Sequence, residues 1–251
     1  MTGMNLPRIL QDDEPTHQEA VDRLRDYCFS TRLLPAKSGA HANPLTLPYF
    51  TGSRFESFRQ QPGTENEITA SDLLSLSLLS VPIKADATLI VIEERRSRIT
   101  ELLQELPTDK DLGELDEETF CSMLGAERKA GSASPGQELW DLLRGNGLDG
   151  RIGMGPVRVS KLLARKRPRL LPIYDTLVAT AFDLRDSLGY WKEFHSIMRP
   201  EVGLADRLSR IRTEAGVVES DTSLLRVMDI LVWHAQKYTD ETWRDRVLST
   251  P

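Results

Sequence analysis

Apolar residues recur at helical spacing along most of this chain, and many of these runs have their own start and stop signals. Ser134, Pro135 and Gln137 supply an N-cap, a proline for the first turn and a capping-box partner to the run that follows, and Gly145 ends it. The alternation of apolar and polar residues that is typical of strands is almost absent. The sequence therefore predicts an all-α fold.

The same signals set the expected boundaries. Thr16 with Glu19 predicts the cap of a first helix of about three turns. Residues 31–48, with their three prolines, are expected to form a loop, and 48–58 could be either a short hairpin around Gly52 or an irregular aromatic segment. The acidic stretch 107–133 predicts a surface excursion between an N-terminal helical region, 1–133, and a second region, 134–251, on which it packs. Further helices are expected over 69–81, 86–106, 135–144, 156–166, 176–188, 191–198, 201–215 and 222–238.

Composition excludes several classes of protein. No apolar run approaches eighteen residues, and the first residues lack the order of an export signal, so a cytoplasmic protein without a membrane partner is expected. Cys28 and Cys121 are far apart, and the four histidines are scattered. This spacing predicts no metal site, and we expect no cofactor.

Positive charge is concentrated in one segment. From Arg151 to Tyr174 there are seven basic residues and no acid, which leaves −13 for the remainder of a chain whose net charge is −6. Local potential, more than total charge, decides whether a polyanion can dock. The segment therefore predicts contact with an anion, although a charged run can also form a solvated face or pair with acids elsewhere in the chain.

The start of this segment has the chemistry of a phosphate site. Gly153 and Gly155 permit a tight turn, and Pro156 suits the first turn of the helix that follows. Such a helix start presents unpaired N–H groups to an anion. Farther along the helix, one face carries basic side chains and another carries apolar ones that can pack. The basic side chains expected on that face are Arg158, Lys161 and Arg165.

This arrangement resembles the helix-hairpin-helix motif of DNA glycosylases of the endonuclease-III-like superfamily, in which a G-x-G turn leads into a helix and backbone amides hold a DNA phosphate. Leu171 to Val178, L-P-I-Y-D-T-L-V, resembles the apolar-Pro-x-x-Asp-Thr-x-Val segment of that superfamily. The likeness covers about residues 135–185. The chain is also similar to an uncharacterised bacterial family with the motif S-K-L-L-A-R-K-R-P-R-L before a P-x-Y-D stretch.

The resemblance implies a glycosylase-like helical fold, double-stranded DNA as partner, and DNA repair by base excision. Asp175, twenty residues after Gly155, would be the catalytic carboxylate, and Tyr174 would line the base pocket. Asp175 also directly precedes a predicted helix, where it would serve as an N-cap. The residues expected to contact DNA are Gly153, Gly155, Arg158, Lys161, Arg165 and Lys166.

The chain departs from the superfamily in ways that limit the chemistry. Arg151-Ile152 stands where a leucine and a proline usually precede the turn, and Val157 occupies the position of the lysine nucleophile of strand-cutting members. The sequence therefore predicts a monofunctional DNA N-glycosylase, a hydrolase without lyase activity. The alternatives are a non-catalytic nucleic-acid-binding or adaptor protein that retains the hairpin, and a helical domain that binds an acidic protein or a small anion.

Two further expectations concern the core. Trp140, Trp191 and Trp233 each fall on an apolar helix face, which is typical of core packing. Arg226 and Asp229 are the polar residues of an otherwise apolar helix, so we expect a buried or half-buried ion pair between them.

Overall fold

The computed structural model describes residues 5–35, 44–125, 133–146, 153–218 and 222–238. It is mainly helical, as the sequence predicts, with one two-stranded sheet. Short 3-10 turns (η) and one π-helical turn connect several of the helices. The α-helices and strands are α1 (Glu14–Phe29), β1 (Thr31–Leu34), β2 (Leu45–Pro48), α2 (Ala70–Ser75), α3 (Ala85–Leu89), α4 (Arg96–Gln104), α5 (Glu117–Leu124), α6 (Pro135–Arg144), α7 (Pro156–Lys166), α8 (Thr176–Ala181), α9 (Tyr190–Met198), α10 (Leu204–Glu214) and α11 (Leu224–Lys237).

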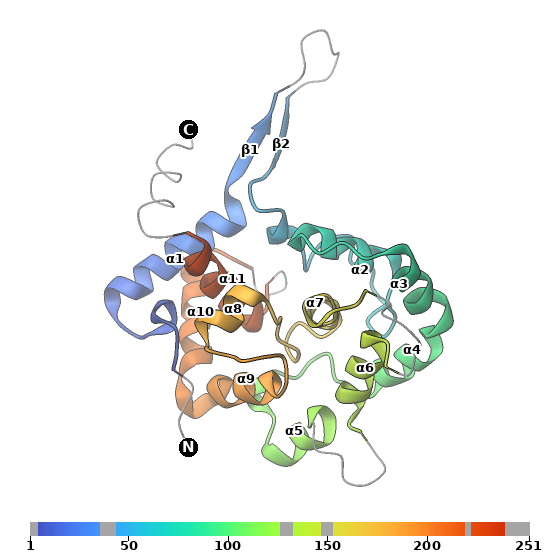
Figure 1. Ribbon diagram of the computed structural model, residues 1–251. Coiled ribbons are helices and arrows are strands. Elements are labelled where there is room, and N and C mark those ends of the chain that lie inside the picture. Colours follow the sequence, from blue (N-terminus) through green and yellow to red (C-terminus); the bar gives the residue numbers. More distant parts are fainter. Residues whose placement is uncertain (1–4, 36–43, 126–132, 147–152, 219–221, 239–251) are drawn as a thin grey trace.

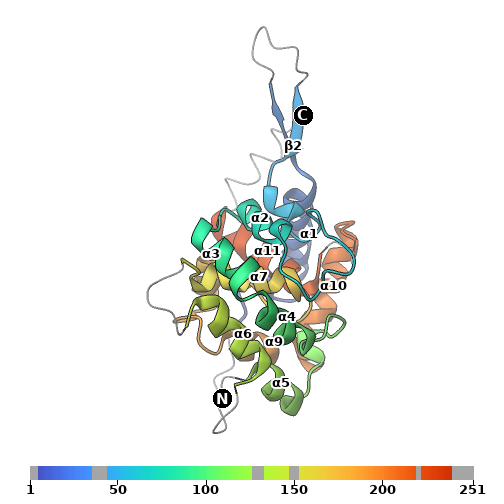
Figure 2. The ribbon, with the colours of Figure 1, turned by 90° about the vertical axis from the view of Figure 1, so that its right-hand side faces the viewer.

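Helix α7 lies in the middle of the molecule. It is seen end-on in Figure 1, with α2, α3, α4 and α6 on one side and α1, α8, α10 and α11 on the other, and lengthwise in Figure 2. Every residue from Val159 to Arg167 is buried. A single apolar cluster includes residues from both expected regions of the chain, and α4 packs against α6 and α1 against α11. This central place determines what the basic residues of α7 can reach.

The prediction of a loop over residues 31–48 is wrong for its two ends. Strands β1 and β2 pair antiparallel, from Thr31 opposite Pro48 to Leu34 opposite Leu45. The hairpin projects from the helical body (Figures 1 and 2). Leucine and threonine supply enough β-propensity for a short ribbon, and the prolines that suggested a loop flank the strands or end them. Residues 36–43 lie outside the described part of the chain.

The capping signals are confirmed at several helices. Thr69 forms a capping box with Asp72 before α2, Ser134 caps α6, and Gly145 ends α6 in the left-handed conformation, with φ 84°. The first helix instead begins at Glu14, because Asp13 is its cap: the Asp13 carboxylate accepts bonds from both the N–H and the hydroxyl of Thr16. Local signals thus fix helix starts to within a few residues.

Other boundaries differ from the prediction. The helix expected over 86–106 is interrupted by a π-helical turn, Ile90–Glu94, and the one expected over 176–188 ends at Ala181, shortly before Asp183, whose φ is 53°. Residues 48–58 contain a 3-10 turn, η2 (Thr51–Arg54), with no strand pairing around Gly52. The helix expected over 201–215 is a short 3-10 turn, η6 (Pro200–Val202), followed by α10.

The stretch 107–133 is not a surface excursion where the structure describes it. Leu112, Leu115 and Phe120 are buried. Leu112 N–H donates to the Arg169 carbonyl over 3.0 Å, and His195 Nε2 donates to the Leu115 carbonyl over 2.7 Å. The acidic residues concealed this because they surround apolar residues that pack inward. The part from 126 to 132 lies outside the described residues.

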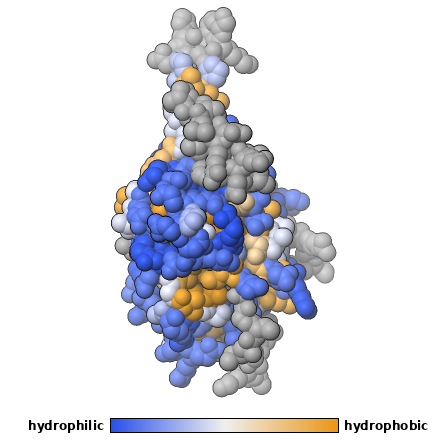
Figure 3. All heavy atoms as spheres, turned by 90° about the vertical axis from the view of Figure 1, so that its left-hand side faces the viewer, coloured by the Kyte–Doolittle hydropathy of each residue, from blue (hydrophilic) through white to orange (hydrophobic). Residues whose placement is uncertain are grey.

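Core expectations are confirmed. Trp140 and Trp191 are buried and Trp233 is partly buried against the apolar cluster. Figure 3 shows a mainly hydrophilic face with an apolar area below its centre and apolar residues on the projecting hairpin. Within the described ranges, no helix combines the length and the hydropathy that a membrane span requires.

Candidate nucleic-acid interface

The turn before α7 leaves the backbone accessible. Gly153 is left-handed, with φ 79°, and Met154 between the glycines is buried, which anchors the turn. Gly155 is the N-cap of α7, with extended backbone and no side-chain cap bond. A Cβ built on Gly155 would have no heavy atom within 4 Å. Pro156 has no N–H, and the Arg158 N–H donates to the Gly155 carbonyl over 3.0 Å, so the N–H groups of Gly155 and Val157 are those that this open space could offer to an anion.

Two cations flank this turn. Arg158 donates through Nε to the Pro82 carbonyl over 2.9 Å and through Nη1 to the Gly153 carbonyl over 3.3 Å, so its guanidinium braces the turn without an acidic partner in these bonds. Lys84 is exposed, and its Cδ would lie 3.1 Å from a Cβ at Gly153. Sequence analysis missed Lys84 because it is far from the motif in the chain. No local signal could have found it.

The structure brings Lys161 and Asp175 together. Lys161 Nζ donates to Asp175 Oδ2 over 3.0 Å, and the two side chains are only 6% and 17% exposed. Asp175 Oδ1 accepts the N–H of Leu177 over 3.1 Å, so the carboxylate caps α8 as the sequence allowed. One carboxylate is thus fixed by a lysine and a helix start, with a small part of its surface open. Its catalytic role remains a prediction.

Ser160 holds the segment of Asp175 against α7. Its hydroxyl donates to the Tyr174 carbonyl over 3.1 Å and accepts the Tyr174 N–H over 3.0 Å. The Tyr174 side chain is half-buried, and its ring packs edge-on against Tyr190 with centroids 5.4 Å apart. Tyr174 therefore lies beside Asp175 with one side of its ring engaged in the core.

Arg165 and Lys166 have internal partners in place of the DNA contact expected from the sequence. Arg165 Nε lies 3.1 Å from Asp72 Oδ1, and Lys166 Nζ lies 3.0 Å from Asp72 Oδ2. All three side chains are nearly inaccessible to solvent. The reason is the central position of α7, which surrounds its second half with protein. A phosphate cannot reach either cation in this arrangement.

The loop of residues 55–66 accepts further hydrogen bonds from these cations. Arg165 also donates to backbone carbonyls of Phe55, Glu56 and Phe58, and Lys166 donates to the Thr64 carbonyl over 2.9 Å. Arg167 is buried and donates to four carbonyls and an amide oxygen, those of Leu103, Leu106, Glu65, Lys166 and Asn66. The end of the basic segment thus fastens the 55–66 loop to the core.

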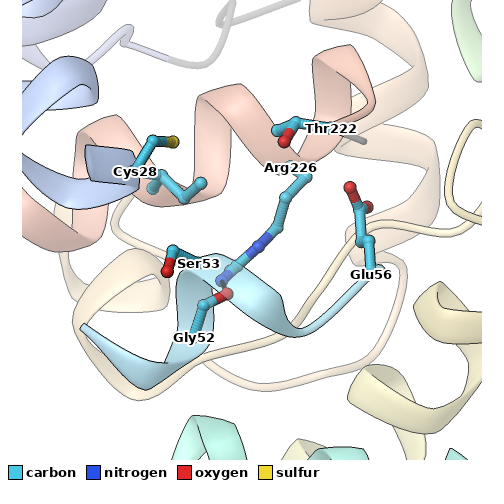
Figure 4. Close-up of a pocket in the computed structure, with 7 residues that line it drawn as sticks. Cys28, Gly52, Ser53, Glu56, Thr222 and Arg226 are labelled. Atoms are coloured by element: carbon cyan, nitrogen blue, oxygen red, sulfur yellow. Dashed lines mark hydrogen bonds between the residues drawn. The ribbon is translucent and has the colours of Figure 1, made fainter. Parts of the chain in front are cut away.

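A second polar cluster lies between the 3-10 turn η2 and α11 (Figure 4). The predicted ion pair between Arg226 and Asp229 is confirmed and buried. Arg226 Nη2 also donates to Tyr27 Oη over 2.9 Å and to the Gly52 carbonyl over 3.1 Å. Burial raises the pKa of Glu56 to about 7, against the opposing influence of Arg226 and of hydrogen bonds from Ser223. Sequence reasoning missed Glu56, a polar residue inside an aromatic segment.

Two cavities lie away from Asp175 and Tyr174. The one beside Glu56 and Arg226 has a volume of about 10 Å³, room for about one water. Another, of about 120 Å³, lies between the N-terminal residues, α1 and α11, and Arg8 and Arg23 contribute to its lining. Neither is lined by Asp175 or Tyr174. Among the described residues, no group of three His, Cys, Asp or Glu side chains could hold a metal ion.

Comparison with known proteins assigns the chain to a family. It belongs to a family of unknown function (DUF6308), whose model matches residues 20–236. No curated protein and no solved structure matches the chain. The match spans the hairpin, α7 and Asp175, so the arrangement described above lies within the part of the chain that defines the family. The family description supplies no activity, and function has to be argued from the site.

Proposed function

We propose that this protein binds duplex DNA through a helix-hairpin-helix formed by α6, the turn at 153–155 and α7. One observation carries the proposal: a helix start at Gly155 that has no side-chain cap and has open space where a side chain would stand. Amides at such a helix start hold a phosphate through directed N–H bonds and the helix dipole. Lys84 and Arg158 add two positive charges beside the same turn.

The burial of Arg165 and Lys166 limits the number of phosphate contacts. Lys84 and Arg158 alone correspond to a slope of about −2 in a plot of log K against log salt concentration, because each neutralised phosphate contributes about −0.9. This is a shallow dependence for a DNA-binding protein. A shallow dependence is consistent with a protein of net charge −6 that binds one short stretch of the DNA backbone and does not bind along the whole duplex.

The test is the affinity of the purified protein for a fluorescent duplex over a series of salt concentrations. Gly155→Val places a branched side chain beside the first turn of α7, at a position where a Cβ would meet no heavy atom within 4 Å. We expect it to weaken binding while the melting temperature stays close to that of the wild type. Lys84→Glu should weaken binding and make the slope shallower by about one. Lys110→Glu, also exposed, is the matched control and should change neither. Absence of duplex binding at low salt would refute the proposal.

Asp175 gives a second candidate function, excision of a base by hydrolysis of its N-glycosidic bond. The observation that favours it is the fixed carboxylate, held by Lys161 and by the Leu177 N–H with part of its surface open. Departure of the base creates positive charge on the sugar, which a fixed carboxylate stabilises while a water attacks. Lys161 would act as a positioning residue, since its ammonium contacts Asp175 and is itself buried.

Asp175→Asn separates the two functions. Asparagine caps a helix about as well as aspartate, so α8 should remain folded, but buried Lys161 loses its counter-charge and the melting temperature should fall. An excising enzyme should lose base release from damaged duplexes while keeping its affinity for an abasic-site analogue. Unchanged base release would exclude Asp175 as the catalytic group. If the wild type releases no base but binds duplex, the DNA-binding function stands without the chemistry.

A further inference from the structure

Exposed arginines lie on the projecting hairpin and at its base. Arg32 on β1, Arg54 in η2 and Arg59 in the following loop are all exposed. None of the three forms an ion pair with any other part of the chain that the structure describes. This contrasts with the second half of α7, where Arg165 and Lys166 share the carboxylate of Asp72 inside the protein.

The hairpin does not belong to the core. All four residues of β1 are exposed, and β2 is exposed or half-buried. The register places Arg32, Leu34, Leu45 and Leu47 on one face of the ribbon, because residues paired across the strands point the same way. Leu33, Leu34 and Leu45 are 63%, 39% and 60% exposed. A two-stranded ribbon of this kind is marginally stable alone, and such an exposed apolar face indicates a partner.

Charge favours a polyanion as that partner. The two strands contain one arginine and no acid, and the first acid after them, Glu56, directs its carboxylate to the N–H and hydroxyl of Ser223. A second copy of the chain would bring the same exposed arginines and the same net charge of −6. Three partly exposed leucines also fall well short of the surface of about 800 Å² per partner that a stable dimer buries.

Contacts connect the hairpin base to the α7 turn. Thr51 of η2 donates through Oγ1 to the Leu78 carbonyl over 2.8 Å, and Arg158 donates to the Pro82 carbonyl over 2.9 Å. Leu78 and Pro82 are four residues apart in one short segment. The hairpin base and the proposed phosphate site are therefore attached to two ends of the same short piece of chain.

We propose that the β1–β2 ribbon enters the major groove of the duplex whose backbone is held at the α7 turn, an inference that rests on the proposed function. The major groove admits a two-stranded ribbon. The leucine face lies against apolar base edges such as thymine methyl groups. Arg32 shares that face but lies nearer the base of the ribbon than Leu34, so its long side chain contacts a phosphate at the groove edge, and Arg54 contacts a second one. The proposal adds two phosphate contacts to those of the turn. It predicts a wild-type salt slope of about −4 in place of about −2.

The experiment compares the wild type with Arg32→Glu/Arg54→Glu and with Leu34→Ser/Leu45→Ser, with Lys110→Glu as the exposed charge-reversal control. All four altered side chains are exposed or nearly so, and we expect each variant to melt like the wild type. Anisotropy of a labelled duplex of two helical turns should show the arginine variant losing about two units of salt slope. The leucine variant should bind more weakly with an unchanged slope.

The outcomes separate this inference from the function on which it rests. If the wild type does not bind the duplex, the proposed function itself fails. If the wild type binds and both ribbon variants bind equally well, the ribbon is not a DNA contact and the α7 turn stands alone. Sedimentation of all proteins is measured in parallel. A wild-type dimer that the leucine variant dissociates, with DNA affinity unchanged, would overturn the proposal in favour of self-association.

Discussion

The substitution Asp72→Asn is the strongest test of the pairing of the basic segment with an acid inside the protein. Asp72→Asn keeps the volume of the side chain but removes the charge that neutralises Arg165 and Lys166. The carboxylate also accepts the N–H and the hydroxyl of Thr69 in the capping box. The substitution therefore leaves two buried cations without a counter-charge and weakens the start of α2.

The expected cost is large because the cluster is almost free of solvent. Breaking a buried ion pair by removal of one partner costs about 3–5 kcal/mol. For a chain of this size each kcal/mol lowers the melting temperature by about 2–4 °C, so the expected decrease is about 6–20 °C. Burial raises the pKa of Asp72, but Lys166 and bonds from Thr69 lower it further, and the net shift is downward from 3.8. Its stabilisation is therefore present above pH 3.8 and is lost as the pH falls below that value.

The assay is thermal unfolding followed by circular dichroism at neutral pH and at acid pH. Asp116→Asn is the matched control, since Asp116 caps α5 on the surface and asparagine caps equally well. Should Asp72→Asn not fold, Lys166→Met provides a milder perturbation, because Asp72 then keeps its bond to Arg165. A melting temperature of Asp72→Asn within 2 °C of the wild type would refute the reasoning that these cations are neutralised internally.

Three further perturbations test other parts of the structure. The raised pKa of Glu56 means that, between pH 4.5 and 7, the folded state retains a proton that the unfolded state has lost. The free energy of unfolding therefore decreases as the pH rises through this range. Glu56→Gln should flatten that decrease, as measured by urea unfolding at several pH values. Gly153→Ala should destabilise by about 1–2 kcal/mol in the same assay, because alanine is strained at φ 79° and its Cβ would crowd Lys84. Burial raises the pKa of the Cys28 thiol to about 11, so a thiol reagent at pH 8 should label the exposed Cys121 first, and equal rates would contradict this.

The sequence predicts the helical class well because capping is a local property. Thr69, Ser134 and Gly145 act within four residues of where they stand, and the structure uses all three. The hairpin could not be predicted in the same way. Its strands are four residues long and face solvent on both sides, so no alternation of buried and exposed positions marks them. Prolines near both strands made a loop the simpler interpretation.

The candidate site was predictable only in part. The proximity of Asp175 to α7 followed from a motif of known spacing, and the pairing of Lys161 with Asp175 is an i to i+14 contact within it. The burial of Arg165 and Lys166 was not predictable, since their acid lies more than ninety residues earlier in the chain. A count of charges along the sequence does not reveal which charges are neutralised by distant groups.

The buried end of the basic segment stabilises the loop at the base of the ribbon. Arg165 donates hydrogen bonds to the carbonyls of Phe55, Glu56 and Phe58, which directly follow η2 and the hairpin. The C-terminal half of α7 therefore fixes the base of the ribbon, while the first turn of the same helix carries the proposed phosphate site. A rigid helix holds these two ends at a constant separation, which one duplex requires if it is to meet both. On this basis the acidic balance of the rest of the chain is not an obstacle to DNA binding. It supplies Asp72, which allows Arg165 and Lys166 to be buried where they fix the base of the ribbon.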